Sequence, residues 1–172
     1  MTANGTFDTV DDRPALRFER RLRHPIDRVW RALTDASDLA QWFPDTIEAD
    51  WREGGQVRFL DHVEGGSTGA VLAFEPPRRL AYDWYTNELR FELEPDGDGA
   101  TLLRLTALLS EREAAARDAA GWHVCLDRLE QALDSGDATA PGPDSTPEWS
   151  ALFDAYVAAG LPGGAPVPGR DE

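Results

Sequence analysis

Large apolar side chains recur along this chain at strand and helix spacing, which makes them its first candidates for a chemical role. One set of these side chains alternates along successive predicted strands and so lies on a single face of each strand. A second set lies on one side of a predicted helix. A small-molecule cavity needs such an apolar lining and a few polar groups that orient the ligand. The candidate lining residues are Phe59, Tyr82, Trp84, Phe91 and Leu105 from the strands, with Trp122, Leu126 and Leu129 from the helix. Core residues follow the same pattern, so the sequence leaves open whether they surround a cavity or fill it.

Three polar side chains could add specificity to such a cavity. Arg20 and Asp61 each share a strand face with apolar neighbours, so either is a polar anchor inside the cavity or lies at a strand end in water. The Tyr82 hydroxyl could donate a hydrogen bond to a ligand carbonyl or act as an acid. Because no base is identified beside it, we assign no catalytic residue.

The remaining residues with catalytic or metal-binding potential do not form a site in the sequence. His123 and Cys125 lie two apart on a predicted helix, where side chains point about 200° apart and cannot share an ion. His62 and Glu64 can share a strand face, but two ligands without a third make a weak site. No phosphate-binding loop, dinucleotide fingerprint or Ser/His/Asp arrangement is present. We expect no metal and no cofactor, and a binding protein is favoured over an enzyme.

The charge balance and apolar content exclude several partners. The chain carries 32 acidic and 17 basic residues, a net charge of −15, which argues against nucleic-acid binding. It has no run of about 18 apolar residues, and its first residues are polar and acidic, so we expect no membrane insertion, no secretory signal and a cytoplasmic location. The single cysteine, Cys125, excludes an internal disulfide and is expected to be buried and inert.

The elements that position these residues can be predicted from periodicity and turn residues. Alternating runs bounded by Gly, Pro, Asn and Asp predict seven antiparallel strands near 14–23, 47–51, 56–62, 68–75, 80–85, 88–95 and 100–109. Two short helices, 26–33 and 35–41, follow the first strand. Ser110 and Glu113 are spaced as in a capping box, which predicts a long helix that starts near Glu111 and ends at Leu133. Gly121 inside this helix is expected to allow a close approach to the sheet or a kink.

Composition divides the chain into a domain and its flanking segments. We expect a flexible N-terminus at 1–13, one domain at 14–133, a linker at 134–146, a short amphipathic helix at 147–159 and a disordered tail at 160–172. The apolar side of the 147–159 helix must dock on a surface. The sequence leaves open whether that surface is its own domain or a partner, which includes a possible homodimer.

Four segments in register resemble a known family. They are FERRLRHPIDRVWRALTDASDLAQWF at 18–43, DWREGGQVRF at 50–59, GAVLAFEPPRRLAYDW at 69–84 and GWHVCLDRL at 121–129. With them, residues 14–133 resemble the activator of heat-shock protein 90 ATPase homologue family, part of the START-like (SRPBCC) superfamily. The resemblance implies an α+β helix-grip fold, in which a bent seven-stranded antiparallel sheet surrounds a long C-terminal helix and two short helices follow the first strand.

The same resemblance implies a function, because proteins of this superfamily often hold apolar molecules between helix and sheet. We expect a carrier or sensor that binds a lipid, polyketide or aromatic metabolite there. One alternative is an enzyme of the cyclase, dehydratase or hydrolase type that uses the same cavity. Another is a chaperone-associated or self-associating interaction module.

Overall fold

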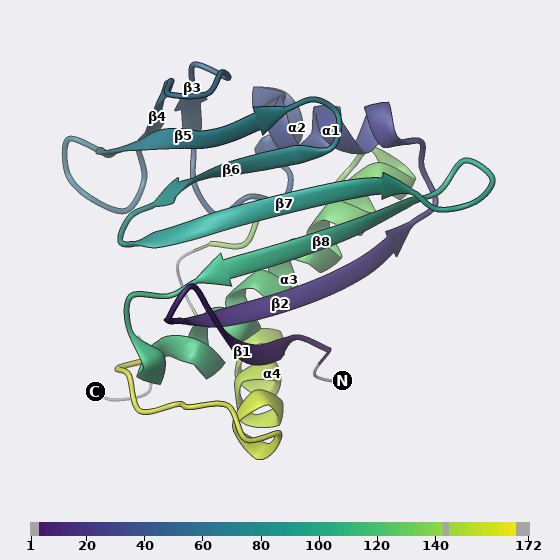
Figure 1. Cartoon of the computed structure of the whole chain (residues 1–172). Helices are drawn as coiled ribbons and strands as arrows, with labels where there is room; N and C mark the ends of the chain where they lie inside the picture. Colours follow the sequence, from purple (N-terminus) through teal and green to yellow (C-terminus); the bar gives the residue numbers. More distant parts are fainter. Residues whose placement is uncertain (1–3, 143–144, 168–172) are drawn as a thin grey trace.

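The computed structural model describes residues 4–142 and 145–167, and an antiparallel sheet forms its largest element (Figure 1). The eight strands are β1 (Thr6–Val10), β2 (Arg13–Leu22), β3 (Ile47–Ala49), β4 (Gln56–Phe59), β5 (Ser67–Glu75), β6 (Arg79–Trp84), β7 (Asn87–Pro95) and β8 (Thr101–Leu108). They are arranged in the order β1-β2-β8-β7-β6-β5-β4-β3. The helices are α1 (Ile26–Thr34), α2 (Ala36–Leu39), the 3-10 turn η1 (Arg112–Ala114), α3 (Ala115–Ser135) and α4 (Pro147–Ala158).

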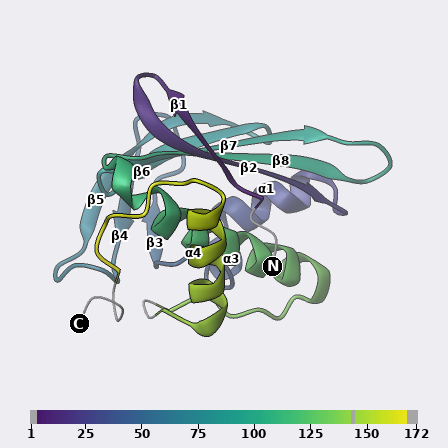
Figure 2. The same ribbon diagram turned by 90° about the horizontal axis from the view of Figure 1, so that it is seen from below.

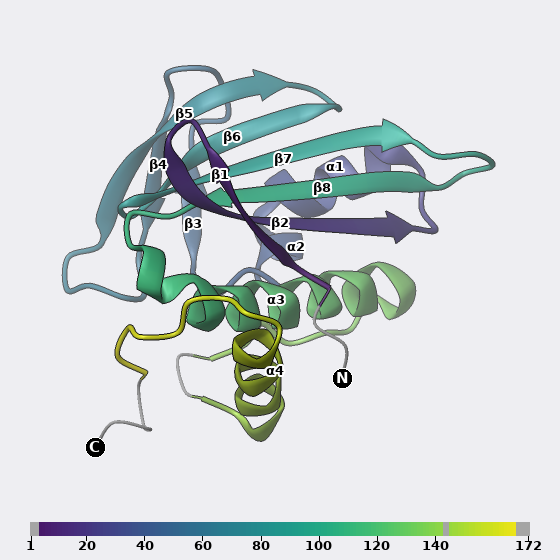
Figure 3. The same cartoon turned by 60° about the horizontal axis from the view of Figure 1, so that its bottom comes forward.

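The sheet curves around α3, which confirms the predicted α+β helix-grip fold (Figure 3). The predicted apolar stripe of the long helix is buried as a whole and packs against the inner face of the sheet. That stripe consists of Ala115, Ala119, Trp122, Leu126, Leu129 and Leu133. Burial of one helical stripe against alternate strand residues explains why two simple periodicities specify this core.

The sheet has eight strands rather than the predicted seven, because part of the N-terminus is not flexible. Residues 6–10 form β1, which pairs with β2 through a two-residue turn at Asp11 and Asp12. Both turn residues have positive φ, 51° and 61°, as a tight hairpin of this type requires. Asp-Asp is a weak hairpin signal beside Asn-Gly, which explains why the sequence pattern did not reveal this strand.

The long helix does not begin with the expected capping box. The Ser110 hydroxyl instead bonds to that of Thr86 (2.8 Å), and a Glu113 carboxylate oxygen accepts the backbone N–H of Gly164 (3.2 Å). The first N–H groups of a helix need acceptors, and the carbonyl oxygen of Pro162 accepts the N–H of Ala116 at 2.8 Å. A distant segment of the chain thus accepts one of the first N–H groups of α3, and the Ser110 N–H that the box would cap donates to the Asn87 side chain at 3.0 Å.

The expected disorder of residues 160–172 is wrong for residues 160–167. Leu161, Ala165 and Val167 are buried, and the N–H of Ala165 donates to the carbonyl of Glu113 at 3.1 Å. These contacts hold the segment against η1 and the start of α3, whereas residues 168–172 lie outside the described residues. Gly and Pro content alone therefore does not predict disorder when a helix end offers unpaired backbone groups.

Helix α4 packs on the side of α3 that faces away from the sheet (Figure 2). The Thr146 hydroxyl caps it by accepting the N–H of Trp149 at 3.1 Å, and Leu152 and Tyr156 are fully buried. Its apolar side is thus covered by the same chain. Among the described residues, no helix is both long and apolar enough to cross a membrane.

Candidate functional site

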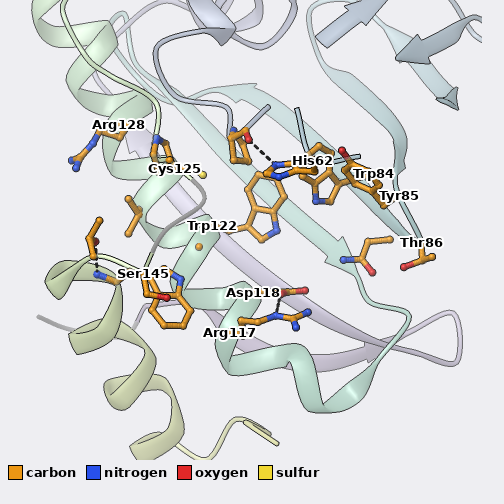
Figure 4. Close-up of a pocket in the computed structure, with 18 of the residues that line it drawn as sticks. His62, Trp84, Tyr85, Thr86, Arg117, Asp118, Trp122, Cys125, Arg128 and Ser145 are labelled. Carbon is orange, nitrogen blue, oxygen red and sulfur yellow. Dashed lines mark hydrogen bonds and ion pairs between the residues drawn. The ribbon is translucent and has the colours of Figure 1, made fainter. Parts of the chain in front are cut away.

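A pocket of about 610 Å³ opens between α3, the β6–β7 hairpin and the segment that leads into α4 (Figure 4). This volume lies within the range of about 300–1,000 Å³ typical of small-molecule sites. The hairpin side contributes Pro44, His62, Val63 and residues 84–87; α3 contributes Arg117, Asp118, Gly121, Trp122, Val124, Cys125 and Arg128; the remaining wall is Pro141, Gly142, Ser145, Thr146 and Trp149. A smaller hollow of about 390 Å³ shares Pro44, His62, Pro141 and Gly142 with it.

The walls of the pocket are aromatic and come from distant parts of the chain. Trp84 at the end of β6 and Trp122 on α3 meet edge to face, with ring centroids 6.0 Å apart. Tyr85 packs against Trp84 at 4.7 Å, and Trp149 reaches the pocket from α4. Such rings offer flat apolar surfaces to a ligand together with a few hydrogen-bonding edges.

The wall formed by the hairpin is held in place by a buried carboxylate. Asp45 accepts the backbone N–H groups of Leu60 and Asp61 at 3.1 and 2.9 Å, and the Tyr85 hydroxyl donates to it at 2.8 Å. Burial, followed by the bond to Asp45, raises the pKa of Tyr85. Tyr85 also has a φ of 53°, which a bulky residue rarely adopts. The Asp45 bond thus fixes an aromatic side chain that the backbone alone would not favour.

His62 lies on the same wall, and a hydrogen bond fixes the orientation of its ring. Its Nε2 lies 2.9 Å from the carbonyl oxygen of Pro44, and since a carbonyl only accepts, Nε2 carries the proton. The ring packs edge to face against Trp84 and Tyr85 at 5.8 and 5.9 Å.

Across the pocket, α3 supplies a charged pair (Figure 4). The Nε of Arg117 donates to Asp118 at 2.9 Å, and the Asp118 side chain is 19% exposed. Burial raises the pKa of the Asp118 carboxyl, although Arg117 and the Asn87 side chain oppose that shift. An acid whose charged form is disfavoured in a cavity is a candidate for proton transfer or for hydrogen bonding to a ligand.

Gly121 and Cys125 lie one helical turn apart on the wall formed by α3. A Cβ on Gly121 would meet nothing closer than the Trp149 indole nitrogen at 3.9 Å. The glycine thus faces the pocket and α4, and the expected close approach to the sheet is not found. Burial raises the pKa of the Cys125 thiol, which keeps it protonated.

The structure separates the predicted lining residues into two groups. Trp84 and Trp122 line the pocket, whereas the other six are buried in the packed core. These six are Phe59, Tyr82, Phe91, Leu105, Leu126 and Leu129. The space between these side chains of α3 and the sheet is therefore filled, and the cavity lies along another side of α3, from Arg117 to Arg128.

The two predicted polar anchors lie outside this pocket. Arg20 is 8% exposed and donates to Asp127 at 2.9 Å and to Glu130 at 3.0 Å, so it joins β2 to α3. Asp61 is exposed, lines the smaller hollow, and accepts the N–H and hydroxyl of Thr46. Asp61 thus lies in solvent just beyond the end of β4, as the alternative expectation had it, whereas Arg20 is buried within β2 and is in neither predicted position.

Several pocket residues could not be identified from the sequence. Tyr85 belongs to a two-residue turn, and the sequence does not distinguish Asp118 from the other charged residues of α3. Trp149 belongs to the helix predicted at 147–159, but nothing in the sequence placed that helix beside the pocket. Among the described residues, no three His, Cys, Asp or Glu side chains are grouped so as to hold a metal ion.

Residues 23–134 match the sequence profile of the family described as Activator of Hsp90 ATPase homolog 1-like protein. The chain belongs to this family. Activator of Hsp90 ATPase homologues have a fold known for ligand binding and for polyketide cyclase or aromatase roles. No curated protein sequence matches the chain.

Several solved structures share this fold. EF2215 from Enterococcus faecalis, a conserved protein of unknown function, has 24% identity over 90% of this chain and 89% of its own, with a TM-score of 0.72. CalU16 from Micromonospora echinospora has 26% identity over 90% and 94%, with a TM-score of 0.67. DynU16, from the dynemicin biosynthetic locus, has 27% identity over 72% of this chain and 48% of its own, with a TM-score of 0.63.

Proposed function

We propose that this protein binds a small apolar molecule with an aromatic ring system in the pocket between α3, the β6–β7 hairpin and α4, and that it acts as a carrier or sensor. The observation that carries this proposal is the aromatic wall. Trp84, Tyr85, Trp122 and Trp149 converge from three elements on one cavity. Side chains that served only to fill a core would leave no such space between them.

The charges around the pocket favour a neutral ligand. The two guanidinium groups on the α3 wall are each paired with a carboxylate of the same chain, Arg117 with Asp118 and Arg128 with Glu148 at 3.2 Å. An anionic ligand would have to displace one of these pairs. A neutral ring compound with one or two oxygens can use the aromatic faces and leave both pairs intact.

The aromatic side chains that line the pocket support an aromatic compound over a lipid as the ligand class. The rings of Trp84 and Trp122 meet edge to face there, and the lining includes few aliphatic side chains. Among lipid, polyketide and aromatic metabolite, we therefore favour polyketide-like aromatic compounds.

Calorimetry with a neutral naphthalene ketone, 2-acetylnaphthalene, tests the proposal. Gly121→Leu places a branched side chain into the pocket, where a Cβ has free space, and is expected to weaken binding at least ten-fold. Gln131→Leu makes a similarly apolar change on an exposed position of the same helix and is expected to bind as the wild type does. Equal binding by all three proteins, or by none, contradicts the proposal.

A second candidate is an enzyme of the dehydratase or cyclase type, which the Asp118 carboxyl favours. This reaction requires the acid form of Asp118, which burial favours and the Arg117 pair opposes. That form donates a proton to the departing hydroxyl, while Nδ1 of a neutral His62 ring accepts a proton from the carbon beside the ketone. The net change is loss of one water from a β-hydroxy ketone. Mass spectrometry of aryl β-hydroxy ketones after incubation with the wild type and with Asp118→Asn tests this candidate, and an unchanged rate in the variant contradicts it.

A further inference from the structure

The Tyr82 hydroxyl is a buried polar group whose hydrogen-bonding capacity is unused. Tyr82 is 0% exposed, and within the described part of the chain its hydroxyl has no hydrogen-bond partner. Two other buried atoms there, Arg20 Nε and Arg28 Nη1, also lack a partner, but both belong to guanidinium groups that make other hydrogen bonds. A buried hydroxyl without a partner lowers stability, so its retention requires an explanation.

Tyr82 lies directly inward of the pocket wall. It precedes Trp84 by two residues on β6, so the two side chains share the inner face of the sheet, about 7 Å apart along the strand. Phe59 contacts both rings, with centroids 4.9 Å from Trp84 and 6.3 Å from Tyr82. A ligand seated against Trp84 therefore has Tyr82 as the next residue in depth.

The ring of Phe43 packs against Tyr82 and against both tryptophans that were predicted to line the pocket. The centroid of the Phe43 ring lies 6.4 Å from Tyr82, 5.1 Å from Trp84 and 5.7 Å from Trp122. Phe43 also lines the smaller hollow beside the pocket. Its ring makes no hydrogen bond and borders empty volume, so it can move aside without loss of a polar contact.

We propose that the Tyr82 hydroxyl is a specificity determinant that donates a hydrogen bond to a carbonyl oxygen at the inner end of the ligand. The ligand reaches this hydroxyl by displacing the Phe43 ring. The assignment rests on the proposed function and narrows the ligand class to ring ketones and related oxygen acceptors. Burial raises the pKa of Tyr82, so the hydroxyl stays protonated and available as a donor through the physiological range.

A matched pair of ligands and one conservative variant test this assignment. 2-Acetylnaphthalene carries a carbonyl, and 2-ethylnaphthalene has nearly the same shape without one. Wild-type protein is expected to prefer the ketone, and Tyr82→Phe is expected to bind the ketone three- to ten-fold more weakly with no change for the ethyl compound. Because the hydroxyl has no internal partner, the ligand-free Tyr82→Phe protein is expected to be as stable as the wild type or more stable.

Depth is tested by the indole N–H signal of Trp51, whose ring lies 5.6 Å from Tyr82 and does not line the pocket. This signal is expected to shift with the ketone and to stay in place with the ethyl compound. Three results would overturn the assignment: a loss of stability in ligand-free Tyr82→Phe, equal ketone binding by both proteins, or a Trp51 signal that does not respond to the ketone. Failure of both compounds to bind the wild type would instead contradict the proposed function itself, and the assignment with it.

Discussion

Two titratable side chains of this molecule, Asp118 and His123, lie in largely apolar surroundings. Burial raises the pKa of Asp118, and the neighbouring Arg117 offsets this shift only in part. His123 is 7% exposed, and its Nδ1 lies 2.7 Å from the Tyr156 hydroxyl. Groups like these make the stability of the protein depend on pH in a direction that their pKa shifts define.

Asp118→Asn is expected to leave the free energy of unfolding at pH 7 equal or higher. The pKa of Asp118 is higher in the folded chain than in the unfolded one, so its stabilising contribution is present at low pH and is lost as the pH rises through the folded value. A neutral amide avoids that loss. Urea unfolding of the wild type and the variant at pH 4 and pH 7 measures the effect, and a clear loss of stability at pH 7 would show that the Arg117 pair outweighs burial.

His123 is expected to destabilise the folded chain as the pH falls below about 6.5. Burial is the main cause of its lowered pKa; nearby Arg20 lowers it as well, while Asp127 and Glu148 oppose the shift. As the pH falls, His123 therefore takes up a proton at a higher pH in the unfolded chain than in the folded chain. Its contribution to the free energy of unfolding is fully present above the ordinary pKa of 6.5 and declines as the pH falls towards the pKa of the folded chain.

Comparison with a variant that cannot titrate isolates this effect. The Tyr156 hydroxyl accepts the N–H of Gly5 at 3.0 Å and lies 2.7 Å from Nδ1 of His123; it can donate to Nδ1 of a neutral ring but would have to accept a second N–H from a protonated one. His123→Gln is expected to flatten the decline between pH 7 and pH 5 in thermal unfolding. An equally steep decline in the variant would assign it to other groups.

At the scale of elements, the edge strand β1 depends on one small residue. A Cβ on Gly5 would lie 2.5 Å from a ring carbon of Phe18 and 3.0 Å from the Tyr156 hydroxyl. Gly5→Ala is therefore expected to lower the free energy of unfolding by about 1–3 kcal/mol, as overpacked sites do. Chemical unfolding provides the measurement.

Gly121→Ala is the matched control, because its Cβ meets nothing within 3.9 Å and lies inside a helix. It is expected to raise stability by roughly 0.5–1 kcal/mol. If both alanines changed stability by the same amount, the close approach of β1 to Phe18 would not be a determinant of the fold.

Elements with a clear period were predictable, and those defined by distant contacts were not. The strands from β2 onwards and the buried stripe of α3 follow from alternation and from three- and four-residue spacing. β1 depends on a turn with an uncommon sequence, and the 160–167 segment depends on unpaired groups of a helix start far away in the chain. Periodicity reports which face is apolar, but not which other segment covers it.

For the site as well, only residues on the inward faces of periodic elements could be predicted. Trp84 and Trp122 were candidates because they lie on inward faces. Whether an inward residue meets a cavity or a packed neighbour depends on side-chain volumes, so Phe91 and Leu105 could not be told apart from them. Tyr85 and Trp149 reach the pocket through a turn and through the docking of α4, neither of which has a local signal.

At the scale of the whole molecule, α4 completes the pocket and stabilises the domain. Leu152 is fully buried, so Leu152→Ala is expected to lower the free energy of unfolding by about 2–4 kcal/mol. Because Cys125 and Trp149 line the same pocket, loosening α4 is also expected to speed alkylation of Cys125 by iodoacetamide. Val157→Ala, an exposed position on the same helix, is the control and should change neither value by much.

The six tryptophans provide the most direct test of the pocket itself. Trp84, Trp122 and Trp149 line it, whereas Trp30 packs against Phe74 at 5.6 Å and does not. In a two-dimensional ¹H–¹⁵N spectrum with 2-acetylnaphthalene, the indole signals of the three lining residues are predicted to shift in a saturable way while that of Trp30 stays fixed. Saturation without any shift of Trp84, Trp122 and Trp149, or no response at all, would contradict the account.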